Sequence, residues 1–190
     1  MIYFTSDLHF GHDKPFLYEP RGFTNVYDMN NAIFRNWNSI VTEDDDVYVL
    51  GDLMLNNNEG GLWLIKRLRG RIHIILGNHD TETRERLYRE CYNVVEIVYA
   101  TIVKYGKYRF YLSHYPTLCM HGDDRLPKKD LVNLFGHTHQ QHCFFQDEKT
   151  GVKNYRMYNV GVDAHACTPV SIEDVIADLE NAYESHKSSR

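Results

Sequence analysis

Five short segments of the chain carry side chains that can bind divalent metal ions. Each follows an apolar run typical of a β-strand, and they are Asp7-Leu8-His9, Gly51-Asp52, Gly77-Asn78-His79-Asp80, Ser113-His114 and Gly136-His137-Thr138-His139. Parallel strands present their carboxyl ends together, and functional sites form there, so we expect the five segments to converge. Carboxylate oxygens and imidazole nitrogens are typical ligands of divalent transition metals in hydrolytic sites.

The spacing within the segments supports a metal site. Asp7 and His9 are two residues apart, so in an extended chain their side chains point to the same side and form half of a metal site. His137 and His139 repeat this spacing. Asp52 follows a strand and a glycine, and we expect its carboxylate to bridge two metals with one oxygen to each.

The charge of such a site favours phosphate chemistry. Two divalent cations bring four positive charges, the carboxylates of Asp7 and Asp52 remove two, and the amide of Asn78 and the imidazoles are neutral. The remaining positive charge suits an anionic phosphoryl group and stabilises the charge that develops on its oxygens. Two metals about 4 Å apart also lower the pKa of a shared water toward neutrality, which makes a hydroxide nucleophile.

The elements that position these segments alternate between strand and helix. Apolar runs predict strands at 2–6, 47–50, 71–76, 101–105, 108–113 and 131–135, and helical patterns predict helices at 27–41, 61–68 and 81–90. A second hairpin is expected from 142–146 and 154–160, and a last helix opens at Ser171. This order predicts an α/β fold with parallel pairing in its first half.

In this order, over roughly residues 5–140, the five segments resemble the motif blocks of the calcineurin-like metallophosphoesterase family. The turn Asn159-Val160-Gly161-Val162-Asp163 and the compact length resemble a branch of small bacterial and phage predicted phosphoesterases. The resemblance implies a four-layer α/β/β/α sandwich. We expect one such domain over residues 1–185, followed by a flexible tail at 186–190.

The resemblance also implies a role for each motif residue. Seven residues would hold two metal ions: Asp7, His9 and His139 the first, Asn78, His114 and His137 the second, with Asp52 between them. His79 would bind no metal and would instead steady a phosphoryl oxygen and protonate the leaving group. Asp80 would orient His79, as carboxylates commonly fix imidazoles; the alternative is that it caps the helix that follows.

These roles predict a phosphoesterase in which a metal-bridging hydroxide attacks phosphorus. A phosphodiester is favoured over a phosphomonoester as substrate. Manganese is the expected metal, with iron, zinc and nickel as alternatives, because mixed nitrogen and oxygen ligation suits all of them. Two other functions stay open: a dinucleoside polyphosphate hydrolase, and a scaffold of the same fold that has lost catalysis. The presence of His79 and of every ligand argues against the scaffold.

The composition of the chain limits the kinds of molecule that the protein is expected to bind. The chain has 190 residues and a net charge of −5, and it lacks the long basic run that long nucleic acid requires. No apolar stretch approaches a membrane span, the first residues do not resemble a signal peptide, and the four cysteines form no C-x-x-C pair. We therefore expect a cytoplasmic enzyme with a small phosphorylated substrate. The sequence does not specify its oligomeric state.

A few residues outside the motifs could also lie near the site. His12 and Asn57 follow motif blocks, but a solvent-facing imidazole and a turn former are the favoured interpretations. Arg21 can grip phosphate, although a solvated charge is expected, and His165 follows the 159–163 turn toward the site. Residues 116–130 mix basic and apolar side chains after a ligand strand and are expected to form a substrate-selecting lid.

Overall fold

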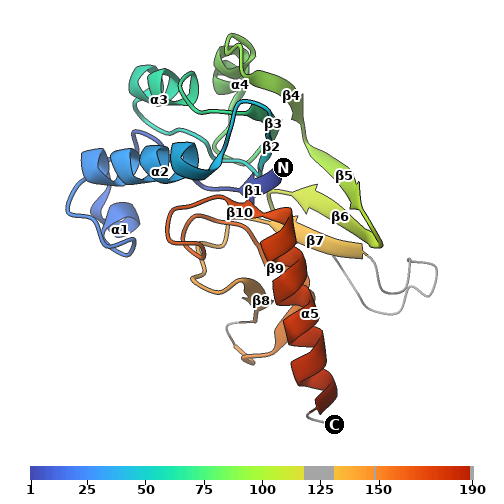
Figure 1. The fold of residues 1–190 in the computed structure, drawn as a ribbon. Helices are drawn as coiled ribbons and strands as arrows, with labels where there is room; N and C mark the ends of the chain where they lie inside the picture. The colour runs from blue at the N-terminus through green and yellow to red at the C-terminus, as the bar shows by residue number, and fades with distance from the viewer. Residues whose placement is uncertain (118–130, 148, 189–190) are drawn as a thin grey trace.

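The computed structural model describes residues 1–117, 131–147 and 149–188. It contains two five-stranded sheets and flanking helices (Figure 1). The strands are β1 (Ile2–Thr5), β2 (Asp46–Val49), β3 (Arg71–Ile75), β4 (Val94–Val98), β5 (Ala100–Tyr105), β6 (Tyr108–Ser113), β7 (Leu131–Phe135), β8 (Phe144–Gln146), β9 (Lys153–Asn159) and β10 (Val170–Ser171). The helices are α1 (Pro15–Tyr18), α2 (Val26–Ile40), α3 (Asn58–Ile65), α4 (Glu82–Arg89) and α5 (Ile172–Ser188).

The first sheet has the strand order β10-β1-β2-β3-β4. Strands β1 to β4 pair in parallel, while β10 pairs antiparallel with β1. Both faces of these strands contribute buried apolar side chains, Val47 and Ile72 on one face and Phe4 and Ile75 on the other, as in parallel sheets that are covered on both sides. The carboxyl ends of β1, β2 and β3 therefore lie side by side.

The second sheet has the order β5-β6-β7-β9-β8. Its outer pairs, β5 with β6 and β8 with β9, are antiparallel hairpins, whereas β6, β7 and β9 run parallel to one another. The two sheets meet where Ser6, just after β1, bridges to Gly161, just after β9. The carboxyl ends of both sets of parallel strands are thus brought to one place.

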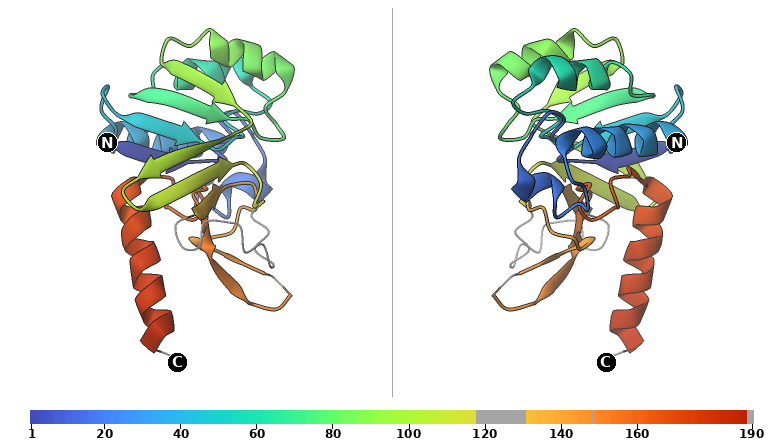
Figure 2. Two further views of the ribbon diagram at one scale, coloured as in Figure 1. Left: turned by 90° about the vertical axis from the view of Figure 1, so that its right-hand side faces the viewer. Right: turned by 90° about the vertical axis from the view of Figure 1, so that its left-hand side faces the viewer.

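Two apolar cores hold the layers together. Helix α2 buries Met29, Ile33 and Trp37, which recur at helical spacing, in a cluster shared with the first sheet. A second cluster joins the sheets, with Phe4 from β1 and Phe110 from β6, and it extends to apolar side chains of α5. Helices α2, α3 and α4 lie together at one end of the molecule, and α5 extends from the other (Figures 1 and 2).

The predicted α/β class, with two sheets flanked by helices, is confirmed. Three elements have no counterpart in the prediction: α1 is a single turn, β10 has two residues, and β4 is an edge strand with a half-exposed pattern. Helix α5 continues to Ser188, so it includes the first part of the predicted tail at 186–190. Most of the predicted lid at 116–130 lies outside the described residues. Among the described helices, none is long and apolar enough to cross a membrane.

Candidate active site

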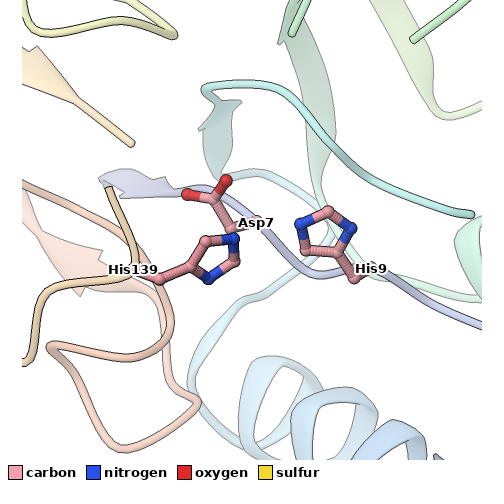
Figure 3. Close-up of side chains that lie close together, drawn as sticks. All are labelled: Asp7, His9 and His139. Atoms are coloured by element: carbon pink, nitrogen blue, oxygen red, sulfur yellow. The ribbon is translucent and has the colours of Figure 1, made fainter. Parts of the chain in front are cut away.

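The five predicted segments converge where the two sheets meet. The first three follow β1, β2 and β3, and the last two follow β6 and β7. The ring centroids of His9 and His139, which come from different sheets, lie 5.2 Å apart, and those of His114 and His137 lie 5.0 Å apart. Figure 3 shows Asp7 between the imidazoles of His9 and His139, with His139 reaching toward its carboxylate from the loop after β7.

Two overlapping groups have the geometry of metal ligands. In the first, Asp7, His9 and His139 each offer an atom, and these atoms lie within 4.8 Å of one another. Asp7 also belongs to the second group, with Asp52 and His114, under the same limit. The first group is the set that was predicted to hold one metal. The second brings the predicted bridging aspartate next to a predicted ligand of the other metal.

Several ligand atoms are buried without a hydrogen-bond partner. Both ring nitrogens of His9 and Oδ1 of Asp7 are in this state within the described residues, although the two residues are only 1–2% exposed. Burying an imidazole or a carboxylate oxygen without a partner is costly. A metal ion bound between the two side chains would satisfy one ring nitrogen of His9 and Oδ1 of Asp7, so the donor set fits the group that the sequence implies.

Asp52 lies between the two halves of the site. Its Oδ2 is 3.6 Å from Nε2 of His9 and 3.6 Å from Nε2 of His114. Its Oδ1 instead accepts a hydrogen bond of 2.9 Å from the backbone N–H of His79. Oδ2 is therefore the oxygen of Asp52 that faces both halves of the site, while Oδ1 is held by the backbone.

His114 and Asn78 give a second indication of a bound cation. Nδ1 of His114 lies 2.7 Å from the carbonyl oxygen of Leu50 and must donate to it, because a carbonyl only accepts. In the neutral ring Nε2 then carries a lone pair, and it faces Oδ1 of Asn78, a second acceptor, at 2.8 Å. A cation between the two acceptors would remove their repulsion.

The backbone at the site is strained. Five of the predicted metal ligands have positive φ angles between 49° and 69°, a region that residues other than glycine rarely occupy. They are Asp7, His9, Asp52, His137 and His139. Hydrogen bonds hold some of these turns, including those from the N–H of Asp7 to Gly51 O and from the N–H of His9 to Asp52 O. Such concentration of strained residues is typical of functional sites.

The glycines before the ligands are required by close packing. A Cβ atom on Gly136 would collide with Ser6 and with the carboxylate of Asp7, and one on Gly77 would collide with Asp52. On Gly51 it would lie 2.5 Å from Nδ1 of His114. The pattern of glycine followed by a ligand thus reflects how tightly the loops of the two sheets approach.

Burial disfavours charge within the cluster. Burial lowers the pKa of His9 well below its usual range, and nearby imidazoles lower it further. Burial raises the pKa of Asp52, and the neighbouring carboxylates of Asp7 and Asp80 add to this shift. The pKa of His137 is also lowered, first by burial and then by His114. Neutral imidazoles are the form that binds metals.

His79 stands apart from the metal ligands. Its ring is half-buried and lies edge-on to His9, with centroids 5.5 Å apart. The hydrogen bonds found among the described residues do not involve its imidazole, while its backbone carbonyl accepts from Arg84. The ring is therefore near the ligand cluster and available to a substrate.

The prediction that Asp80 orients the ring of His79 is wrong in this structure. Its Oδ2 accepts from the N–H groups of Asp52 and Gly77 at 2.7 and 2.9 Å, and its Oδ1 accepts from the hydroxyl of Tyr88 at 2.7 Å. The alternative of a helix cap also does not apply, because Thr81 precedes α4 and makes no side-chain cap. Asp80 instead fastens the loops after β2 and β3 to each other.

Two residues of the site were not assigned to it from the sequence. Arg21, expected as a solvated charge, has a side chain only 1% exposed and forms an ion pair of 2.8 Å with Asp163. Asp163 also lies 2.9 Å from Nδ1 of His139. A signal for Asp163 was present, since it follows strand β9 as the five motif segments follow theirs.

The three remaining candidate residues have different surroundings in the structure. Asn57 caps α3 by accepting from the N–H of Gly60, which confirms it as a turn former. His12 is half-buried rather than solvent-facing, with its ring 5.4 Å from that of His9. Nε2 of His165 bonds the carbonyl of Asn159 at 2.8 Å, which gives it a structural partner.

Comparisons with known proteins identify the family. A model of the calcineurin-like phosphoesterase superfamily domain matches residues 1–181. An uncharacterized protein of Methanocaldococcus jannaschii is 33% identical over 182 residues, covering 94% of this chain and 91% of its own length. The gene 66 protein of Mycobacterium phage D29 is 30% identical over 203 residues, covering 94% and 97%. A crystal structure of an Aquifex aeolicus protein of unknown function shares the fold, with a TM-score of 0.67 at 23% identity and coverage of 93% and 98%. The chain belongs to the calcineurin-like phosphoesterase superfamily.

Proposed function

We propose that the protein is a dinuclear-metal phosphoesterase that hydrolyses a small phosphodiester. Asp7, His9 and His139 would hold the first metal, Asn78, His114 and His137 would hold the second, and Asp52 would lie between them. Manganese is the metal that we expect, with iron, zinc and nickel able to bind the same ligands. The family supports metal-dependent hydrolysis of phosphoric esters; the ligand assignments and the diester preference are our proposal.

The position of Asp52 carries this proposal. A carboxylate oxygen at equal distances of 3.6 Å from two imidazole nitrogens of separate half-sites is where a bridging ligand belongs. A single-metal site would give no reason for His9 and His114 to approach the same oxygen from two sheets. The lack of hydrogen-bond partners at the ring nitrogens of His9 supports metal binding at its half of the site.

The chemistry divides between the metals and His79. Bound divalent cations supply Lewis acidity toward the phosphoryl oxygens and lower the pKa of water. A water that has lost one proton to solvent forms a bond from its oxygen to phosphorus while the bond from phosphorus to the leaving oxygen breaks. The imidazolium form of His79 gives the leaving oxygen its proton and becomes neutral. The hydrogen bond from the N–H of His79 to Asp52 fixes this residue relative to the centre of the cluster.

The surroundings of the cluster suit a small, singly charged ester. A cavity of about 560 Å³ adjoins His137, and its walls include Thr138, Lys149 and the ring of Phe145. Two arginines at the cluster are already engaged, Arg21 by Asp163 and Arg84 by Asn58 and the carbonyl of His79. Among the described residues, these two arginines are therefore occupied by partners within the protein, which favours a monoanionic diester over a dianionic monoester.

A substrate panel with measured metal content tests the proposal. We expect manganese-loaded protein to contain about two metals per chain and to hydrolyse a cyclic nucleotide or a linear diester faster than a phosphomonoester. Preferred cleavage of a dinucleoside polyphosphate would move the assignment to that substrate class. Protein that holds two metals and hydrolyses nothing in the panel would instead indicate the idle scaffold.

A further inference from the structure

We propose that Asp163 and Arg21 are positioning residues that hold His139 in the orientation and tautomer needed to bind the first metal. This inference rests on the proposed function, because it assumes that His139 is a ligand. Neither residue touches the substrate or the reacting atoms in the mechanism above. Their effect would be exerted through His139.

The contact between Asp163 and His139 selects one tautomer. Oδ2 of Asp163 lies 2.9 Å from Nδ1 of His139. An ionised carboxylate only accepts hydrogen bonds, so Nδ1 carries the proton, and Nε2 of the neutral ring keeps the lone pair. A carboxylate that fixes the second nitrogen of a metal-binding histidine is a common means of raising metal affinity.

Arg21 fixes Asp163 in turn. Its Nε lies 2.8 Å from Oδ1 and its Nη2 lies 2.9 Å from Oδ2, which is the two-pronged geometry of a strong arginine–carboxylate pair. The same Nη2 donates to the backbone carbonyl of Asp7 at 2.9 Å. The side chains are 1% and 8% exposed, so both charges are removed from water together. One guanidinium thus links the loop after β1, which carries Asp7, to the loop after β9.

His139 needs such support more than His9, the other histidine of the first group of ligands. Its side chain is 38% exposed and its φ is 52°, whereas His9 is 2% exposed and enclosed by packing. An exposed imidazole on a strained loop samples several rotamers, and ordering it costs free energy at the moment of metal binding. A fixed carboxylate removes much of that cost in advance. Net stability is a weaker explanation, because buried ion pairs contribute little to it.

The test measures the affinity of each metal in Asp163→Asn. Titration calorimetry with Mn²⁺, starting from metal-free protein, should resolve two binding events in the wild type. We expect one event to weaken by about 10- to 100-fold in the variant and the other to stay unchanged. A ¹⁵N spectrum of the histidine rings should also show loss of the fixed Nδ1–H tautomer at His139.

Asp45→Asn is the matched control. The Asp45 side chain is also 8% exposed and charge-paired, but with the amino terminus, before β2 and away from the ligand loops. It should lower stability without changing either affinity. Arg21→Lys, which keeps the charge and loses the two-pronged contact, should give a smaller loss at the same single metal, and it serves as the second variant if Asp163→Asn does not fold.

The possible results distinguish a failure of the positioning role from a failure of the proposed function. Wild-type affinity for both metals in Asp163→Asn, or in Arg21→Lys if only that variant folds, would overturn the positioning role. An equal loss at both metals that matches the drop in stability would also overturn it, in favour of a purely structural pair. If the wild type itself binds no metal, the proposed function fails, independently of Asp163.

Discussion

The two ends of the first sheet use the same residue types in opposite ways. Toward the amino ends of the strands, where β2 begins at Asp46, His73 has both ring nitrogens within 3.0 Å of carboxylates, those of Asp46 and Glu96. At the carboxyl ends, His9 is more deeply buried, yet neither of its ring nitrogens has a partner among the described residues. Both histidines are close to aspartates, so neither residue type nor proximity distinguishes them.

The difference is whether the hydrogen-bonding capacity is used. Asp46 also pairs with Arg71 at 2.7 Å, and Asp45 pairs with the amino terminus at 2.7 Å, so the charges of this end are matched within the protein. At the other end, Asp7 and Asp52 each keep an oxygen directed at imidazoles that do not bond it. We call the first end saturated, because its polar side chains already have partners within the protein, and the second end unsaturated. Buried polar groups without a partner call for a bound ligand. This contrast indicates function more directly than the presence of either motif.

Removal of the central carboxylate should have the largest effect. In Asp52→Ala we expect the metal content to fall below one per chain and activity to fall by at least about 10³-fold, because both halves of the site lose a shared ligand. Metal analysis and turnover of the best diester measure this. Asp46→Asn, at the saturated end, is the control and should keep both metals. A variant at position 52 that still held two metals would contradict the bridge.

Substitution of His79, which lies at the unsaturated end but is not a proposed metal ligand, should have a smaller effect. His79→Asn should keep two metals and lose about 100-fold in kcat on a diester with an alkyl alcohol leaving group, because proton donation is lost. The loss should shrink for a nitrophenolate, which leaves without a proton. The measurement is kcat for both esters alongside metal content. Equal losses on the two esters would remove the role of His79 as an acid.

A substitution at the saturated end should change the free energy of unfolding alone, and only in a defined pH range. Hydrogen bonds from Arg71, with help from His73, lower the pKa of Asp46 from 3.8 to about 2. The folded-state pKa is therefore below the unfolded value, so the stabilisation is complete above about pH 4 and is lost as the pH falls toward 2. Because Asp46 is partly exposed, we expect Asp46→Asn to cost about 1 kcal/mol at pH 6 and almost nothing at pH 2. Urea unfolding of both proteins across this range measures the difference, and a gap independent of pH would show that charge is not its origin.

Much of the fold was accessible from the sequence because its signals are local. The helix expected at 27–41 corresponds to α2, and the runs at 108–113 and 131–135 correspond to β6 and β7. The elements that escaped prediction depend on partners. The two residues of β10 form a strand only because they pair with β1, and β4 mixes exposed and half-buried positions at an edge.

For the site, residue types and order predicted which side chains converge. Positions after parallel strands bring Asp7 and Asp52 together because such strands share one end of a sheet. The tertiary structure adds His114 to them, because the second sheet meets the first at Ser6 and Gly161. The sequence did not reveal the contacts of Asp80 or the pairing of Arg21 with Asp163. These depend on which donor lies near which acceptor across the two sheets.

The amino-acid sequence by itself determined the family, the α/β class and the set of groups available for metal chemistry, because these follow from residue identity and from periodicity along the chain. Only the tertiary structure decided which of those groups are saturated. His73 and His9 look alike in sequence, and they differ because hydrogen-bond partners are assigned in three dimensions. The same holds for Arg21, whose charge is buried between loops that are 142 residues apart in the chain.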